Sequence, residues 1–237
     1  MPALNHPHHH TETLANGLQV SLRHAPHLKR CAAALRVAAG SHDVPLAWPG
    51  LAHFLEHLLF LGTARFPADQ GLMAYVQGHG GQVNARTSER TTDFFFELPA
   101  QAFEGGVERL SDMLAHPRLH QADQLSEREV LHAEFIAWSR NASAQQQFSL
   151  FNGLSAAHPL RAFHAGNRYS LPVPHPAFQQ ALSEFYQRFY QTGQMTLSLA
   201  GPQPVSELKA LAESASKSNV RQTVLPGITP GAYRASR

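Results

Sequence analysis

The feature that most constrains the fold is a short apolar segment that contains three polar side chains. A helix over residues 50–61 is apolar on most of its faces, through Phe54, Leu55, Leu58 and Leu59. Such a helix packs inside a protein. Its remaining stripe carries His53, Glu56 and His57, and burying them costs free energy unless they are bonded. The segment therefore predicts a buried helix with a polar site along one side.

The spacing of these three residues is typical of a metal site. His53 and His57 are four residues apart, so a helix places both imidazoles on one face, one turn apart. Neutral imidazole is a good zinc ligand. Glu56 completes the arrangement H-x-x-E-H, where it can serve as general base towards metal-bound water. The alternative is a pair of partly buried histidines with a solvated glutamate, but the apolar surroundings favour one zinc ion per chain.

A third ligand has to come from elsewhere, because catalytic zinc takes three protein ligands and keeps one position open. The best source is the segment 127–134 (EREVLHAE). Glu127 and Glu134 are seven residues apart, two helical turns, and so face the same way, whereas Glu129 falls on another side. Periodicity alone also fits a solvated acidic helix face, so spacing leaves both interpretations open.

The order of the expected elements favours an α+β fold. We expect strands near 19–23, 31–37, 82–87, 91–98 and 195–200, and helices near 50–61, 69–78, 102–115, 126–140, 176–189 and 205–214. Strands come in pairs and helices in runs, which predicts a mostly antiparallel sheet with helices packed against it. Asn16-Gly17 predicts a hairpin turn, and the run Phe94-Phe95-Phe96 suggests a strand covered on both faces.

Composition sets the expected domain and compartment. Of the 237 residues, we expect a disordered His-rich tail over 1–11, one domain over 12–215, and a linker or disordered tail over 216–237. The formal net charge of +2, without a basic block, gives no electrostatic case for nucleic acid or membrane. Cys31 is the single cysteine, and neither a signal peptide nor a membrane-spanning run is visible, so we expect a cytoplasmic protein.

Two runs carry a resemblance to a known family. Residues 50–57 (GLAHFLEH) and 80–87 (GGQVNART) resemble the pitrilysin/insulysin family of zinc peptidases, and the resemblance covers about residues 12–215. In that family a glutamate in a later segment is the third zinc ligand, and it matches Glu134. A further family glutamate that supports the metal matches Glu127. The resemblance thus implies a zinc endopeptidase domain with Glu56 as general base.

The second run has its own role in the family. There it forms an edge strand beside the zinc, and a substrate peptide pairs with it by strand addition. The resemblance implies that Gly80, Gly81, Asn84 and Ala85 bind substrate, with Asn84 near the scissile carbonyl. From the residues alone, Gly80-Gly81 also fits a plain turn and Asn84 a strand-end cap.

Further runs narrow the resemblance. Residues 89–99, 128–135 and 163–168 are most similar to one bacterial branch, the peptidases of pyrroloquinoline quinone (PQQ) biosynthesis, which cut a modified precursor peptide. Members are usually longer and close a second, similar half around the substrate, so the resemblance implies a partner half. The alternative is a non-catalytic assembly subunit or an inactive fragment. Retention of all four key residues favours the enzyme.

Overall fold

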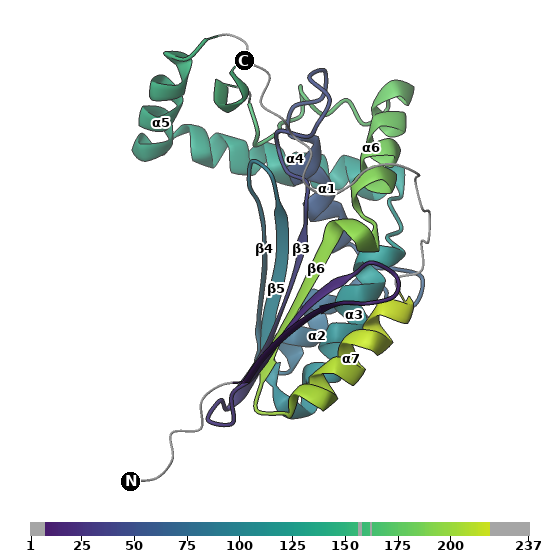
Figure 1. The fold of residues 1–237 in the computed structure, drawn as a ribbon. Coiled ribbons are helices and arrows are strands. Elements are labelled where there is room, and N and C mark those ends of the chain that lie inside the picture. Colours follow the sequence, from purple (N-terminus) through teal and green to yellow (C-terminus); the bar gives the residue numbers. More distant parts are fainter. Residues whose placement is uncertain (1–7, 156–157, 162, 219–237) are drawn as a thin grey trace.

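The computed structural model describes residues 8–155, 158–161 and 163–218, which form a six-stranded sheet with helices packed on it. The strand order is β1-β2-β6-β3-β5-β4 (Figure 1). The strands are β1 (His8–Thr13), β2 (Gln19–His24), β3 (Arg30–Val37), β4 (Gln82–Thr87), β5 (Thr92–Pro99) and β6 (Met195–Gly201). The pair β2–β6 is parallel and the other four pairs are antiparallel, so the predicted α+β class is confirmed.

The helices gather on one side and at one end of this sheet (Figure 1). They are α1 (Leu51–Leu59), α2 (Leu72–Gly78), α3 (Phe103–Ala115), α4 (Gln121–Ser139), α5 (Ala142–Asn152), α6 (Pro176–Phe189) and α7 (Val205–Ser218). Short 3-10 segments lie at Ala68–Gln70, Ala100–Ala102, Pro159–Arg161 and Thr192–Gln194. Within the described ranges, no helix is both long and apolar enough to cross a membrane.

The core lies on a single face of the sheet. Along β3 and β5 buried and accessible residues alternate, as period-two side-chain placement requires. Phe94 and Phe96 are buried against the helices, whereas Phe95 points to the other face and is 40% exposed. The prediction that this run is covered on both faces is therefore wrong. An aromatic residue on the open face made a half-buried strand look like a fully buried one.

The N-terminal histidines are part of the fold. β1 pairs with β2 from His8↔His24 to Thr13↔Gln19, and the predicted turn at Asn16-Gly17 joins them, with Gly17 at φ +88°. The prediction of a disordered tail is wrong for residues 8–11, because an edge strand can be held by backbone pairing without apolar side chains. The expected tail over residues 1–7 lies outside the described residues.

The C-terminal boundary of the domain also lies beyond the predicted one. α7 runs to Ser218, three residues beyond the expected domain end at residue 215, and it covers the sheet together with α3 (Figure 1). The remainder of the expected tail, residues 219–237, lies outside the described part of the chain. The helix α5 was not predicted, because Ala142–Asn152 is rich in glutamine and buries only Ala144.

Candidate metal centre

The helix α1 is held firmly in the core. Seven of its nine residues are buried, and it packs against β4, α4 and α6. Its N-terminus begins at Gly50, whose φ of +92° favours glycine. A Cβ on Gly50 would lie 2.3 Å from the Cα of Gly166, so only glycine lets the two backbones approach this closely. The loop around residue 166 is thereby pressed against the start of the helix that carries the predicted metal ligands.

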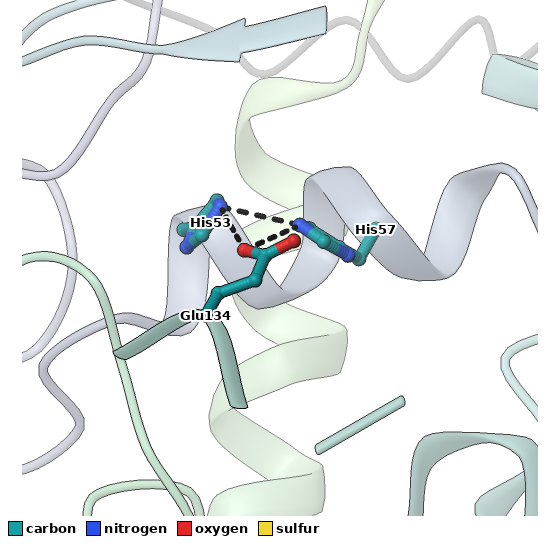
Figure 2. Close-up of side chains that lie close together, drawn as sticks. All are labelled: His53, His57 and Glu134. Carbon is teal, nitrogen blue, oxygen red and sulfur yellow. Dashed lines mark hydrogen bonds and ion pairs between the residues drawn. The ribbon is translucent and has the colours of Figure 1, made fainter. Parts of the chain in front are cut away.

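The two histidines of α1 and one glutamate of α4 converge on a single point (Figure 2). The two Nε2 atoms of His53 and His57 are 3.2 Å apart. Glu134 Oε2 lies 3.9 Å from His53 Nε2 and 3.6 Å from His57 Nε2. The Glu134 side chain is half exposed, which leaves the solvent side of the cluster open. The sequence prediction thus named the three residues that the fold brings together.

Hydrogen bonds fix which nitrogen of each imidazole is free. His53 Nδ1 lies 2.7 Å from the carbonyl oxygen of Ala165, and His57 Nδ1 lies 2.7 Å from Glu127 Oε1. Because both partners are acceptors, each Nδ1 donates its proton and each Nε2 of a neutral ring keeps its lone pair. This is the arrangement that metal-binding histidines use. The predicted supporting position of Glu127 corresponds to this contact with His57.

The donor set fits a zinc ion. Two nitrogen lone pairs and a carboxylate that face one another repel unless a cation lies between them. Zinc bonds of about 2.1 Å at tetrahedral angles separate neighbouring ligand atoms by roughly 3.4 Å. The three observed separations of 3.2, 3.6 and 3.9 Å bracket that value. Residues of the cluster would therefore need only small side-chain shifts to hold the ion.

The electrostatics of His57 point to the same need for positive charge. Burial lowers the pKa of His57, but its hydrogen bond to Glu127 and the negative charges of Glu134, Glu127 and Glu56 outweigh burial and raise this pKa. Three carboxylates around one imidazole thus favour a cation at this position, either a proton or a metal.

Glu56 lies beside the cluster and has a partner of its own. Its side chain is buried, with 7% of the residue exposed, and its Oε2 accepts a hydrogen bond of 2.5 Å from Thr87 Oγ1. The Glu56 charge is close enough to raise the pKa of His57. The sequence prediction placed Glu56 beside the ligands but assigned no role to Thr87. The sequence did offer one signal for Thr87, because it is a hydroxyl-bearing residue at the end of the strand predicted after Gly80-Gly81.

The strand β4 is at the edge of the sheet and packs against α1. Gly80, at φ +65°, and Gly81 form the turn into it. Its side chains alternate, so Ala85 and Thr87 face α1, whereas Asn84 faces the open side of the sheet with Phe95. Asn84 Oδ1 accepts a hydrogen bond from the Ala85 amide at 2.9 Å. The fold brings the backbone of β4 to α1, but it does not bring the Asn84 side chain into the cluster.

Two contacts of the site were beyond the sequence prediction. The carbonyl of Ala165 orients His53, and a backbone group cannot be recognised from residue type. The same loop is tied to α4 by an ion pair between Arg168 and Glu129, the glutamate predicted to face away from the metal. The loop and α4 therefore support the site together, although they are separated in the chain.

Comparisons with known proteins show the family of this chain. A family model described as Insulinase (Peptidase family M16) matches residues 19–158, more than half of the chain. The chain therefore belongs to this peptidase family. Coenzyme PQQ synthesis protein F of Pseudomonas protegens is 77% identical over 196 residues, which are 83% of this chain and 24% of that protein. The protein of the same name from Pseudomonas syringae pv. tomato is 67% identical over 215 residues, 89% of this chain and 28% of that protein.

A solved structure extends the comparison to the fold. The crystal structure of pitrilysin matches with a TM-score of 0.83 and 30% sequence identity, over 96% of this chain and 24% of that chain. The chain thus spans about a quarter of the length of the relatives that it matches.

Proposed function

We propose that this domain is the zinc-carrying part of a metalloendopeptidase that cuts a precursor peptide in PQQ synthesis. The observation that carries the proposal is the convergence of His53, His57 and Glu134, with both histidine Nδ1 atoms held by acceptors. Family membership supports peptidase chemistry. The names of the relatives support the place in PQQ synthesis.

The proposed division of roles follows from the contacts. Bound zinc would act as a Lewis acid that acidifies water in the open position and polarises the peptide carbonyl. Glu56 takes the proton of the attacking water at its free Oε1 and later passes it to the leaving amine nitrogen. Glu127 holds His57 through Nδ1, which keeps Nε2 directed at the metal position.

The proposed peptide site is the free edge of β4. An extended peptide can add to an edge strand through backbone hydrogen bonds, which are tolerant of sequence. Gly80 and Gly81 lie at the start of this edge, where Gly80 has open space around it, and Asn84 and Ala85 would contact the peptide farther along the strand. Because the Asn84 side chain faces the open side of the sheet, we expect it to contact a part of the peptide away from the scissile carbonyl.

We propose that the chain alone binds zinc but cleaves peptides poorly. The relatives are about three to four times as long, which fits further domains that enclose the substrate. Correct positioning can lower a barrier by ~7–11 kcal/mol in favourable cases. A peptide that binds to one exposed edge loses conformational entropy without gaining contacts from a second protein surface, so it should bind weakly.

The test uses the chain with and without a second part, which is the portion of a longer relative that this chain does not cover. A precursor peptide of PQQ synthesis is incubated with each, and products are followed by mass spectrometry, with Glu56→Gln as the inactive control. We expect zinc-dependent cleavage only when the second part is added. Efficient cleavage by the chain alone would overturn the need for a partner. A complete lack of cleavage with the second part present would favour an assembly role instead.

A further inference from the structure

The contact between Thr87 and Glu56 joins the proposed general base to the proposed peptide-binding strand. Helix α1 fixes the backbone of Glu56, but a glutamate side chain keeps three rotatable bonds. The hydroxyl of Thr87 lies 2.5 Å from Glu56 Oε2, the separation of a charge-assisted O–H···O⁻ bond. With 7% of Glu56 exposed, little water is available to replace this donor.

We propose that Thr87 is a positioning residue of the peptidase reaction. It holds Glu56 by Oε2, and so keeps Oε1 as the oxygen that accepts the proton of the attacking water. The inference rests on the proposed function, because it assigns the base an orientation for that reaction.

Thr87 is itself held in place by backbone contacts. It ends β4 opposite Thr92 of β5, and the Ser88 amide then donates to the Thr91 carbonyl at 2.8 Å. The loop before α1 closes on this turn, since the Ser41 amide donates to the Ser88 carbonyl at 2.9 Å. A Cβ on Gly40 would lie 2.2 Å from the same carbonyl oxygen, so the approach depends on glycine. The hydroxyl donor therefore sits on a fixed frame.

Strand β4 also connects the Thr87–Glu56 contact to the proposed substrate position. Ala85 and Thr87 lie on one face of β4, two residues or ~7 Å apart along the strand. A peptide that pairs with the free edge of β4 takes its register from this backbone. One strand would thus set both the position of the scissile bond and the orientation of Glu56. This makes Thr87 part of how the base and the bond are brought together.

A purely structural role makes different predictions. If Thr87 only satisfies a buried carboxylate, its removal should lower stability and leave turnover per folded, zinc-loaded molecule unchanged. If Thr87 positions Glu56, removal of its hydroxyl should lower kcat without changing KM or zinc content. A serine at this position should restore kcat.

The kinetic test uses the chain combined with the second part from a longer relative, and three variants of the chain. Thr87→Val removes the hydroxyl at nearly constant shape, Thr87→Ser keeps it, and Thr196→Val is the control. Thr196 is also a half-buried strand residue, with a hydroxyl bond of 3.5 Å to Gln19. We expect kcat to fall ~10–100-fold in Thr87→Val, with zinc content and KM unchanged. Thr87→Ser should recover most of the loss, and the control should match the wild type.

A second measurement needs neither zinc nor activity. Urea midpoints are compared for the wild-type chain, Thr87→Val, Glu56→Ala and the double variant. We expect Thr87→Val to lower the midpoint in the wild type and to change it much less beside Glu56→Ala, because the two groups are coupled. Equal effects in both backgrounds, or an unchanged kcat in Thr87→Val, would overturn the inference. Absence of turnover when the wild-type chain is combined with the second part would instead overturn the proposed function on which the inference rests.

Discussion

The two helices that supply the metal ligands are packed very differently. α1 buries seven of its nine residues, among them Leu55 at 0% exposure. α4 is more than twice as long and buries only Gln124 and Leu131. Its outer face leaves Val130 46% exposed and Ile136 39% exposed. One helix is therefore part of the core, and the other lies on it.

This difference divides the metal centre into a fixed part and an adjustable part. The histidine pair is set by α1, whose position depends on the whole core. Glu134 depends on the weaker attachment of α4, which includes Leu131, the Gln124–Gln179 hydrogen bonds and the ion pair of Glu129 with Arg168. We expect zinc to find two ligands in place and to draw the third into position.

The largest effect should come from the base on α1. Glu56→Gln keeps the size of the side chain but cannot take the proton, so turnover of the chain combined with the second part should fall ~10²–10⁴-fold. Zinc content should remain that of the wild type, because the three ligands are untouched. The exposed Glu104 on α3 provides the control Glu104→Gln, with unchanged turnover. Loss of zinc in Glu56→Gln would mean that Glu56 is a ligand.

A pair of truncations measures the difference in packing. Leu55→Ala should lower the free energy of unfolding by ~2–5 kcal/mol, because it leaves a cavity under α1. Val130→Ala on the outer face of α4 should change it by ~0.5 kcal/mol or less. Urea unfolding of the chain gives both values. Similar losses in the two variants would contradict the contrast between a core helix and a peripheral one.

Zinc binding should stabilise α4, the adjustable part of the site, more than α1. A ligand at 100 times its Kd adds about 2.7 kcal/mol to the stability of the state that binds it. Hydrogen exchange should show this added protection mainly in α4, since α1 is already protected by the core. Equal protection of both helices would show that α4 is as firmly placed as α1 before zinc binds.

A smaller effect is expected for the glutamate that orients His57. Glu127→Gln replaces a carboxylate by an amide at His57 Nδ1, and changes of this kind typically cost ~10–100-fold in metal affinity or activity. Competition with a chelator of known affinity measures the zinc affinity, and circular dichroism checks the fold. An unchanged affinity and an unchanged rate together would reduce Glu127 to a solvated acidic residue.

The sequence predicted the parts of the site that are set by local periodicity. Residues one helical turn apart must share a face, so His53 and His57 could be paired from spacing alone. The choice of Glu134 over a solvated helix face needed the family resemblance, because seven-residue spacing fits both. Ala165 could not be predicted, since its contribution is a carbonyl oxygen placed by the fold.

The wrong predictions about the fold have a common cause. The strand β1 and the open face at Phe95 were misjudged because side-chain polarity was used to infer structure that backbone pairing determines. The parallel pair β2–β6 brings together segments far apart in the chain, and no local pattern specifies such a partner. Composition predicts what a segment buries more reliably than what it pairs with.

His53, His57 and Glu134 are expected to hold one zinc ion. The direct measurement is zinc per chain by plasma mass spectrometry, for the wild type and for each alanine variant of these three residues. Asparagines replace His8, His9 and His10 in every sample, because these histidines can bind metal and deleting them would remove half of β1. We predict one zinc per chain in the parent and strong loss in all three variants. Full zinc content in Glu134→Ala would show that Glu134 is not the third ligand.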